Sequence, residues 1–305
     1  MKKIQFLLFP ALVAGVSLLT SGIASADNVF VTNNGDDSIL EITSGSSTPT
    51  VFIHDTTNLN GPTGLAFGSN GNLYVANNGP IGGGFIAEYS STGVFLGDVA
   101  TGLSNPRGLV FDSAGNLYVS NQSGGSIVEI PVGGGSPFTL TTGFNFPNGL
   151  AYSNGNLYVA NAGSSAIEQI SLPSGSASNP VFATGVNNPN GLAFLNGALL
   201  EADTNTGSIL KFDSNGSLLG TFASGIASPH GLSVDSLGNV WVTSEGSIGE
   251  VLEFSSNGDL LDTFTGFSGP NYITTEAVPE PATYALMLGG LGALFFFARR
   301  KKATI

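Results

Sequence analysis

Six polar residues of this chain hold one fixed place in a recurring phrase, directly after a proline. They are Thr63, Arg107, Asn148, Asn190, His230 and Asn271. A histidine with a pKa near neutrality is a natural proton acceptor, and the amide oxygens of Asn148 and Asn190 are ligands that Ca²⁺ or Mg²⁺ can use. None of the six is a carboxylate and one is a guanidinium, so the set makes a poor divalent site. We expect these residues to hydrate a channel mouth without a cofactor; the alternative is a cation at Asn148 and Asn190.

The phrase that carries these residues reads Pro-x-Gly-Leu-Ala-Phe with small variations, and Gly-Asn-Leu-Tyr-Val-Ala-Asn follows several copies of it. The first five prolines stand 44, 41, 42 and 40 residues apart, and a sixth follows after 41. They are Pro62, Pro106, Pro147, Pro189, Pro229 and Pro270. A period of about 40 to 45 residues with several strands in each unit is typical of a β-propeller.

Each unit predicts four short strands, and one unit illustrates the pattern. Residues 108–111 form a short apolar strand, and the turn 113–116 contains the Gly-Asn pair that supplies a hairpin with positive φ. Residues 117–120 and 126–130 alternate as the second and third strands, and 137–140 form a weaker rim strand. No segment between the two ends of the chain has helical periodicity.

The first and last units are both incomplete, and each supplies what the other lacks. Residues 29–32, 38–42 and 50–53 read as a second, third and fourth strand with no first strand before them. At the other end, the phrase restarts at Pro270 and only the tail follows it. We expect this C-terminal strand to complete the N-terminal blade, because a closed ring has no open sheet edges. The predicted fold class is all-β, a six-bladed β-propeller with four-stranded blades.

The N-terminal residues have the pattern of a secretory signal peptide. Met1-Lys2-Lys3 is basic, 6–19 is an apolar core, and Ala24-Ser25-Ala26 is an A-x-A cleavage site. We therefore divide the chain into a signal peptide at 1–26, a propeller at 27–275 and a C-terminal segment at 276–305.

The C-terminal segment has three parts in a fixed order. Pro279-Glu280-Pro281 comes first, and an uncharged apolar run over 282–298 follows. Four basic residues close it: Arg299, Arg300, Lys301 and Lys302. The run is 17 residues long, at the short end of what spans a bilayer core. The positive-inside bias leaves the basic end in the cytoplasm and the propeller outside, so we predict a transmembrane sorting helix.

This tail resembles the PEP-CTERM sorting signal of bacterial surface proteins, over residues 278–302. The resemblance implies that an exosortase, a membrane protease, is a partner and cuts near Pro-Glu-Pro. It also implies a location at the cell surface or outside the cell, with a transient or stable membrane anchor.

The charge of the stretch 27–278 excludes one class of partner. It holds 20 of the 21 acidic residues but only two basic ones, Arg107 and Lys211, for a formal charge of −18. A domain with two positive charges cannot bind nucleic acid by counterion release. The chain has no cysteine, which excludes disulfides, thiolate metal sites and cysteine nucleophiles.

The two phrases make the whole propeller resemble NHL-type propellers, the SMP-30/gluconolactonase-like group and the streptogramin lyases. In the gluconolactonase-like group, Glu, Asn and Asp at similar positions hold a metal ion. Asn148 and Asn190 match that pattern, whereas the carboxylate is missing.

The segment 230–234, followed by 241–245, resembles the catalytic blade of streptogramin lyases. The resemblance implies a general base at His230 and a metal-binding carboxylate at Glu245. Here one extra residue, Ser244, displaces Glu245 from the matching place.

A second series of polar residues ends the second strand of each unit, on the face where the six phrase residues are expected. It comprises Asn33, Asn77, Asn121, Asn161, Asp203 and Ser244. Asn and Asp at such places bond their own loop backbone in Asx-type turns, so we interpret this series as structural.

These observations favour a non-catalytic binding or structural module of the cell surface or extracellular polysaccharide matrix, with a glycan or surface protein as partner. The alternative is a metal-dependent lactonase- or lyase-like enzyme that acts on a small ligand at the channel mouth, with His230 and Glu245 as catalytic candidates. One fold hosts both kinds of function, so the motifs do not decide between them.

Overall fold

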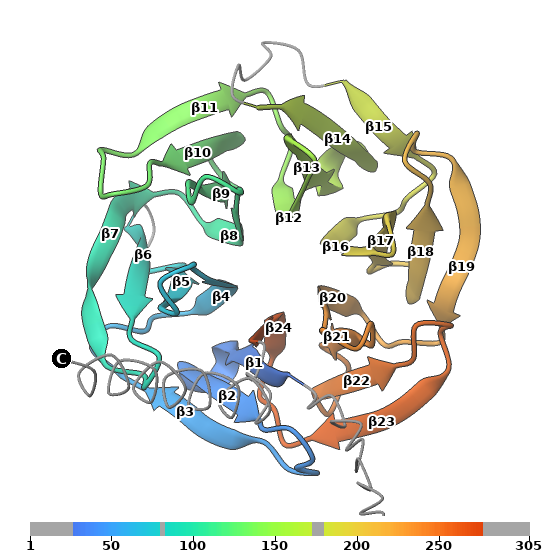
Figure 1. The fold of residues 1–305 in the computed structure, drawn as a ribbon, viewed down its shortest axis with the longest axis horizontal. Helices are drawn as coiled ribbons and strands as arrows, with labels where there is room; N and C mark the ends of the chain where they lie inside the picture. The colour runs from blue at the N-terminus through green and yellow to red at the C-terminus, as the bar shows by residue number, and fades with distance from the viewer. Residues whose placement is uncertain (1–26, 80–82, 173–179, 277–305) are drawn as a thin grey trace, which may run out of the picture. The chain divides into compact units, whose positions relative to one another are not determined.

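The computed structural model describes residues 27–79, 83–172 and 180–276, which form six four-stranded antiparallel sheets arranged as blades around a central channel (Figure 1). The predicted signal peptide at 1–26 and the segment from 277 onward lie outside the described residues. The six-bladed propeller expected from the 40–44-residue period is thereby confirmed.

The strands follow the predicted order from the channel outward. The inner strands are β24 (Pro270–Glu276), β4 (Pro62–Phe67), β8 (Pro106–Phe111), β12 (Pro147–Ser153), β16 (Pro189–Leu195) and β20 (Pro229–Val234). The second strands are β1 (Asn28–Asn33), β5 (Leu73–Asn77), β9 (Leu117–Asn121), β13 (Asn156–Asn161), β17 (Ala198–Asp203) and β21 (Val240–Ser244).

The outer half of each blade is made in the same way. The third strands are β2 (Ser38–Ile42), β6 (Gly84–Tyr89), β10 (Ser126–Ile130), β14 (Ala166–Ser171), β18 (Ser208–Phe212) and β22 (Glu250–Phe254). The outer strands are β3 (Thr50–His54), β7 (Phe95–Leu103), β11 (Phe138–Thr142), β15 (Val181–Thr184), β19 (Leu218–Ser224) and β23 (Leu260–Thr265).

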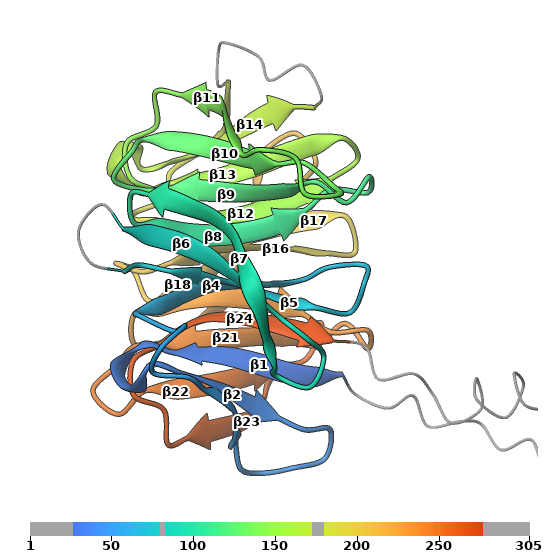
Figure 2. The same ribbon diagram turned by 90° about the vertical axis from the view of Figure 1, so that its left-hand side faces the viewer.

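The ring closes as the two incomplete units predict. Strand β24 pairs with β1 in the sheet β24-β1-β2-β3, with Ile273 opposite Val31. Figures 1 and 2 show the C-terminal β24 beside the N-terminal β1. The hydrogen bonds of this ladder join the two ends of the propeller, so the N-terminal β1 is not left as an open edge.

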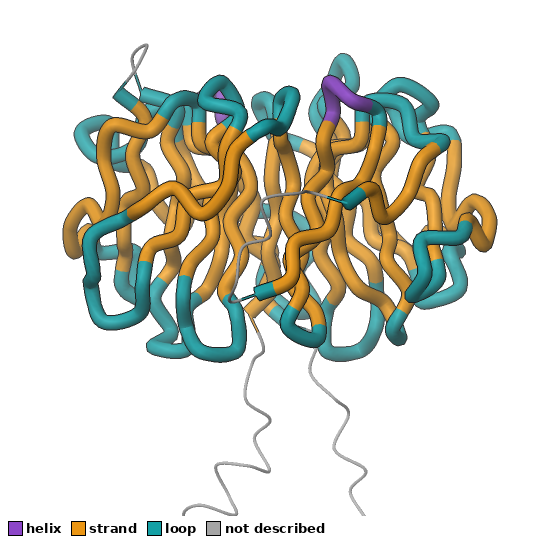
Figure 3. The backbone as a smooth tube through the Cα atoms, turned by 90° about the horizontal axis from the view of Figure 1, so that it is seen from above, coloured by secondary structure: helices purple, strands orange, loops and turns teal. Residues whose placement is uncertain are grey.

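Two short 3₁₀-helices mark one face of the ring, which we call the upper face (Figure 3). They are η1 (Asn34–Asp36) and η2 (Ala162–Ser164), and each follows a second strand. Second strands therefore run toward the upper face, and the antiparallel inner strands run away from it. Strand β1 begins and β24 ends on the opposite, lower face.

The core lies between neighbouring blades rather than within one sheet. Between the first two blades, Leu73 and Val75 of β5 are fully buried against Phe30 and Ile39 of the N-terminal blade. Burial of one such side chain contributes about 1.5–3 kcal/mol. The second strand, with Leu-Tyr-Val in three of the blades, thus supplies a face that packs on the neighbouring blade.

The glycine of the recurring phrase lets adjacent inner strands approach closely. A Cβ atom at Gly191 would lie 2.3 Å from the carbonyl oxygen of His230 in the next blade. One at Gly149 would lie 2.2 Å from the carbonyl oxygen of Asn190. Because side chains at these places would clash with backbone, the residue before each glycine is held at a fixed position around the channel.

One second strand carries a carboxylate in its core. Glu201 of β17 takes the place that valine holds in the other blades, as Val159 does in β13. It is completely buried, and neither carboxylate oxygen has a hydrogen-bond partner among the described residues. Burial, with a smaller effect from the charge of Asp203, raises the Glu201 pKa well above its ordinary value.

Within the described ranges, the structure contains no helix whose length and apolar character would allow it to cross a bilayer. The apolar run at 282–298, for which a transmembrane helix is predicted, lies outside those ranges.

Candidate functional site

The upper end of the channel gathers the residues that follow the phrase prolines. Each phrase proline pairs with the last residue of the neighbouring second strand, as Pro147 does with Asn161 and Pro189 with Asp203. The six inner strands pack on one another around the channel. The residue after each proline therefore lies near the upper mouth, and the second polar series lies on the same face.

These six side chains differ in how far they are available to a ligand. Asn148, Asn190 and Asn271 are buried, and Arg107 and His230 are half-buried. Thr63 is completely buried, and its hydroxyl lies 2.8 Å from the carbonyl oxygen of Pro106 in the next blade. Thr63 thus joins two blades, and the other five supply the polar groups of the mouth.

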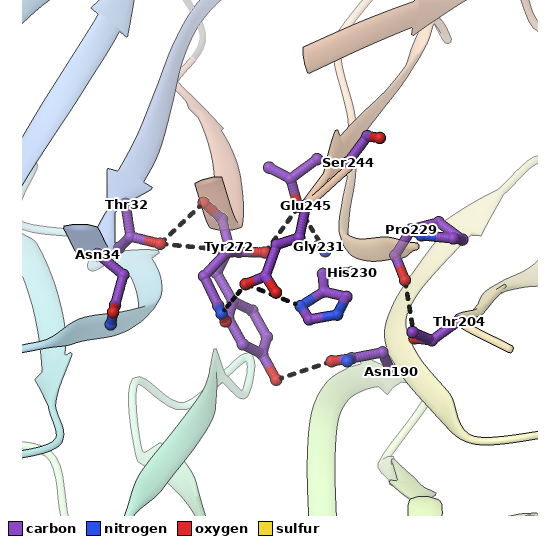
Figure 4. A network of polar contacts seen from close by, with 12 residues as sticks. Thr32, Asn34, Asn190, Thr204, Pro229, His230, Gly231, Ser244, Glu245 and Tyr272 are labelled. Atoms are coloured by element: carbon purple, nitrogen blue, oxygen red, sulfur yellow. Dashed lines mark hydrogen bonds and ion pairs between the residues drawn. The ribbon is translucent and has the colours of Figure 1, made fainter. Parts of the chain in front are cut away.

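His230 and Glu245 are in direct contact, although the extra residue Ser244 shifts Glu245 by one place along the sequence relative to the lyase pattern. The imidazole Nδ1 of His230 lies 3.2 Å from the carboxylate Oε1 of Glu245 (Figure 4). The amide of Asn271 donates a hydrogen bond of 2.5 Å to the same oxygen. The insertion leaves the carboxylate within reach because Glu245 begins the loop after β21, directly above the start of β20.

The surroundings of Glu245 favour its charged form. Burial opposes ionisation, but the contact with His230, the hydrogen bond from Asn271 and the charge of Arg107 outweigh it and lower the Glu245 pKa. When His230 is protonated, the pair forms an ion pair at the mouth. The site can thus hold an imidazolium next to a fixed carboxylate.

Tyr272 closes the channel below this pair. It occupies the place that glycine holds in the other five copies of the phrase, and its hydroxyl donates a hydrogen bond of 3.4 Å to Asn190 (Figure 4). Burial raises the pKa of its phenol, so the hydroxyl stays protonated and keeps its donor. Below it lies a cavity of only about 40 Å³, lined by Leu65, Leu150 and Leu192 among others.

The channel opens again on the lower face. A vestibule of about 390 Å³ is lined by the ends of all six inner strands, including Phe67, Phe111 and Phe194. The narrow apolar segment with Tyr272 separates this vestibule from the upper mouth. The upper mouth is therefore a polar end of the channel, with Tyr272 beneath it.

Three side-chain amides at the upper mouth are joined by successive hydrogen bonds. Asn105 donates to Gln122 at 2.5 Å, Gln122 donates to Asn148, and Asn148 donates to the carbonyl oxygen of Pro189 at 3.5 Å. The side chain of Asn148 is thus hydrogen-bonded to both neighbouring blades, through Gln122 on one side and Pro189 on the other. An amide fixed in this way presents a set hydrogen-bonding direction to a ligand.

Arg107 stands apart from this network. Among the described residues, no carboxylate lies within ion-pair distance of its guanidinium and no group accepts a hydrogen bond from it. Its Nε is shielded from water and has no partner. The side-chain oxygen of Asn271 is likewise shielded and receives no hydrogen bond from the described residues.

The second polar series has a structural task that differs in detail from the prediction. Five of its members accept a hydrogen bond from the backbone of the loop that enters the inner strand, as Asn161 does from Asn145 at 2.8 Å and Asn77 from Asn60 at 2.9 Å. Only Asp203 also bonds the backbone of its own loop, at Thr206. The prediction of own-loop turns is wrong for the others because the entering loop lies closer to these side chains.

The mouth does not suit the divalent cation that the propeller resemblance implies. Among the described phrase residues and their contacts at the mouth, Glu245 is the carboxylate, and His230 and Asn271 already contact it. The positive charge of Arg107 acts on the same carboxylate. No group of three His, Cys, Asp or Glu side chains suited to a metal ion occurs within residues 27–79, 83–172 and 180–276. One engaged carboxylate beside a guanidinium gives a hard cation too little negative charge.

Comparison with known proteins supports the two halves of the sequence interpretation separately. The model of the PEP-CTERM protein-sorting motif matches residues 277–302. The chain carries a PEP-CTERM sorting motif. This match confirms the sorting motif that was predicted from Pro279, Glu280, Pro281, Arg299 and Arg300. It also supports the prediction that the protein is exported. No curated protein matches the sequence.

Solved structures resemble the propeller of this chain. A chain of a nidogen/laminin complex superposes with a TM-score of 0.72 at 19% identity, covering 83% of this chain and 99% of that one. A streptogramin B lyase gives 0.61 at 16% identity, covering 85% and 89%. An inactive variant of virginiamycin B lyase from Staphylococcus aureus, with quinupristin, gives 0.58 at 17% identity, covering 80% and 85%. These TM-scores show a shared fold.

The sequence argument missed two residues of the mouth, and the repeat held a signal for both. Tyr272 is the only departure from glycine among six copies of the phrase. Aligning the copies would have singled it out. Gln122 directly follows Asn121 of the second polar series, as Glu245 follows Ser244, and the structure brings it to Asn148.

Proposed function

We propose that this chain is an exported propeller that binds an extracellular glycan at the upper mouth without converting it. The polar upper mouth is the observation that carries the proposal: amides and one guanidinium line it, and the Tyr272 hydroxyl donates a hydrogen bond to Asn190. Fixed amides are suited to the hydroxyl groups of sugars, because each can donate and accept hydrogen bonds.

The sorting motif supports the cellular setting of this proposal. A protein delivered to the cell surface meets the extracellular polysaccharide matrix, and the high negative charge of residues 27–278 keeps it soluble there. The nidogen/laminin structure is a complex, so the same fold occurs in proteins that bind partners. Exosortase remains the expected processing partner.

A glycan array probed with the full-length protein in detergent tests the proposal. Binding should be saturable and should fall in Asn190→Ala, which removes a mouth amide and the partner of the Tyr272 hydroxyl. Asn70→Ala is the matched control, because Asn70 is an exposed amide in the turn between β4 and β5 on the lower face. Equal loss in both variants, or the absence of any glycan ligand, would contradict the proposal.

A second candidate function is lyase-type proton abstraction, favoured by the contact of 3.2 Å between His230 and Glu245. His230 would accept a proton from a carbon next to a carbonyl group, and the leaving group would depart with the electron pair as a double bond forms. Glu245 would stabilise the resulting imidazolium. The divalent cation does not fit the mouth, so this candidate uses the side chains alone.

Quinupristin, the ligand present in the virginiamycin B lyase structure, is a direct probe of this second candidate. Turnover detected by mass spectrometry and lost in His230→Ala would support it. Turnover that survives in His230→Ala would remove His230 from the mechanism. Intact quinupristin after incubation with the wild-type protein would count against lyase chemistry on that substrate.

A further inference from the structure

Arg107 is the one permanent positive charge among the phrase residues, and the protein leaves it without a partner. Of the two basic residues between 27 and 278, the other, Lys211, lies on the third strand β18, away from the channel. The guanidinium of Arg107 has no ion pair and no hydrogen bond to the described residues. The same stretch holds 20 acidic side chains, yet none of them forms an ion pair with Arg107.

The burial of Arg107 separates it from an ordinary surface arginine. A surface arginine keeps its guanidinium in water, where every N–H is hydrated. Here Arg107 is half-buried, and its Nε is shielded from water and unpaired. A shielded N–H of a charged group without an acceptor is unfavourable, so a ligand that supplies the acceptor is favoured.

The nearest carboxylate of the mouth is already engaged. Glu245 receives the amide of Asn271 and contacts His230. Arg107 acts on Glu245 only through its field. The guanidinium thus has no ion-pair partner among the described residues, and an anionic ligand would supply one.

The remaining groups of the mouth indicate what else the ligand carries. The side-chain oxygens of Asn271 and Asn105 are shielded acceptors that receive no hydrogen bond within the described residues. Hydroxyl groups would satisfy them. A single guanidinium beside the negative charge of Glu245 neutralises one negative charge, so a carboxylate suits the mouth better than a phosphate dianion.

We infer that the upper mouth binds a uronic acid unit of an acidic polysaccharide, with the sugar carboxylate on Arg107 and its hydroxyl groups on the mouth amides. This inference rests on the proposed function, because it names the class of glycan bound at the same upper mouth. Arg107 is then the specificity-determining residue, and the amides contribute equally to neutral and acidic sugars.

Calorimetric titration of the full-length protein in detergent tests this inference with an oligoglucuronate and the matching neutral oligoglucoside. The oligoglucuronate should bind about tenfold more tightly, and Arg107→Gln should abolish that difference by weakening oligoglucuronate binding about tenfold more than oligoglucoside binding. Arg107→Lys, which keeps the charge but loses the planar fork, should retain part of the preference. Lys211→Gln is the matched control and should retain all of it.

The outcomes separate this inference from the proposed function. Equal affinity for the two oligosaccharides, or a preference that survives in Arg107→Gln, would overturn the role of Arg107 and leave glycan binding intact. Displacement of oligoglucuronate by inorganic phosphate at equal concentration would overturn the carboxylate assignment. Absence of binding by both oligosaccharides would overturn the inference and count against the proposed function itself. Circular dichroism of each variant checks that the propeller is folded.

Discussion

The hydroxyl of Tyr272 donates a hydrogen bond of 3.4 Å to the side-chain oxygen of Asn190, across the blade that lies between their two strands. A residue that closes the ring in sequence therefore also closes the channel in space. The phrase glycine brings the inner strands together in five blades, and the tyrosine fills the space that remains. The upper mouth owes its floor to this one substitution.

Replacing Tyr272 tests that account. Tyr272→Gly restores the phrase but removes a buried aromatic side chain, and should lower the free energy of unfolding by about 3–5 kcal/mol. Tyr272→Phe keeps the ring and loses only the hydroxyl, so the loss should be about 0.5–1.5 kcal/mol. Urea unfolding followed by circular dichroism measures both. Equal losses in the two variants would show that the ring does not fill the channel.

Glu201 makes stability depend on pH in an unusual direction. Its folded-state pKa is raised well above the ordinary value, so the folded protein keeps a proton that the unfolded chain releases as the pH rises above about 4.5. The free energy of unfolding should therefore fall as pH increases from about 4.5 toward neutrality. Glu201→Val, which restores the residue of the other blades, should remove this slope and raise stability at pH 7 by about 1–3 kcal/mol.

The control for Glu201 is Glu250→Val, a half-buried carboxylate on the neighbouring blade. In Glu250→Val, the free energy of unfolding measured by chemical denaturation should depend on pH almost as it does in the wild-type protein. If Glu201→Val had the same slope as the wild-type protein, the buried carboxyl would not carry the pH dependence.

The Glu245 carboxylate contributes stability with the opposite sign. Its pKa is lowered in the folded state, so the stability it contributes is present above the unfolded value of about 4.5 and is lost as pH falls through the folded value. In His230→Ala the lowering should weaken. The two proteins should thus differ in stability at pH 6 and converge in acid. Carboxyl NMR titration of Glu245 measures the change; an unaltered pKa would contradict the coupling.

The second polar series predicts a stability effect without an effect on binding. Asn161 accepts a hydrogen bond from the backbone N–H of Asn145, and Asn161→Ala should leave that donor unpaired, at a cost of about 1–3 kcal/mol. Asn161→Asp should not rescue this loss, because the Asn161 amide also donates to the Glu168 carboxylate, which an aspartate would repel. Asn121→Asp should be much milder than Asn121→Ala, because Asn121 faces the Ser126 hydroxyl and Asp203 accepts the equivalent backbone bond in its own blade. Thermal unfolding compares the variants, and Asn121→Asp as damaging as Asn121→Ala would argue against this role.

The architecture was accessible from the sequence because it repeats. The regular prolines, the turn residues and the incomplete first and last units determined the blade number and the pairing of β24 with β1. These features are local and recur in every unit, so errors in one copy are corrected by the others. The placing of the phrase residues near the upper mouth followed from the same repetition.

The details of the site were less accessible because they depend on departures from the repeat. The sequence argument expected Ser244 to displace Glu245, whereas the structure places the carboxylate 3.2 Å from His230. Tyr272 and Glu201 replace a glycine and a valine, and their consequences depend on what the neighbouring blade presents to them. Such contacts lie between residues far apart in the sequence, which no local pattern encodes.

The central claim is that ligand binds in the upper mouth. Hydrogen–deuterium exchange of the full-length protein, with and without a saturating oligosaccharide, tests it most directly. The account predicts slower exchange in the upper loops that precede Arg107 and His230, with the lower turns 112–116 and 235–239 unchanged. Protection confined to the lower turns, or to the outer strands, would contradict a site at the upper mouth.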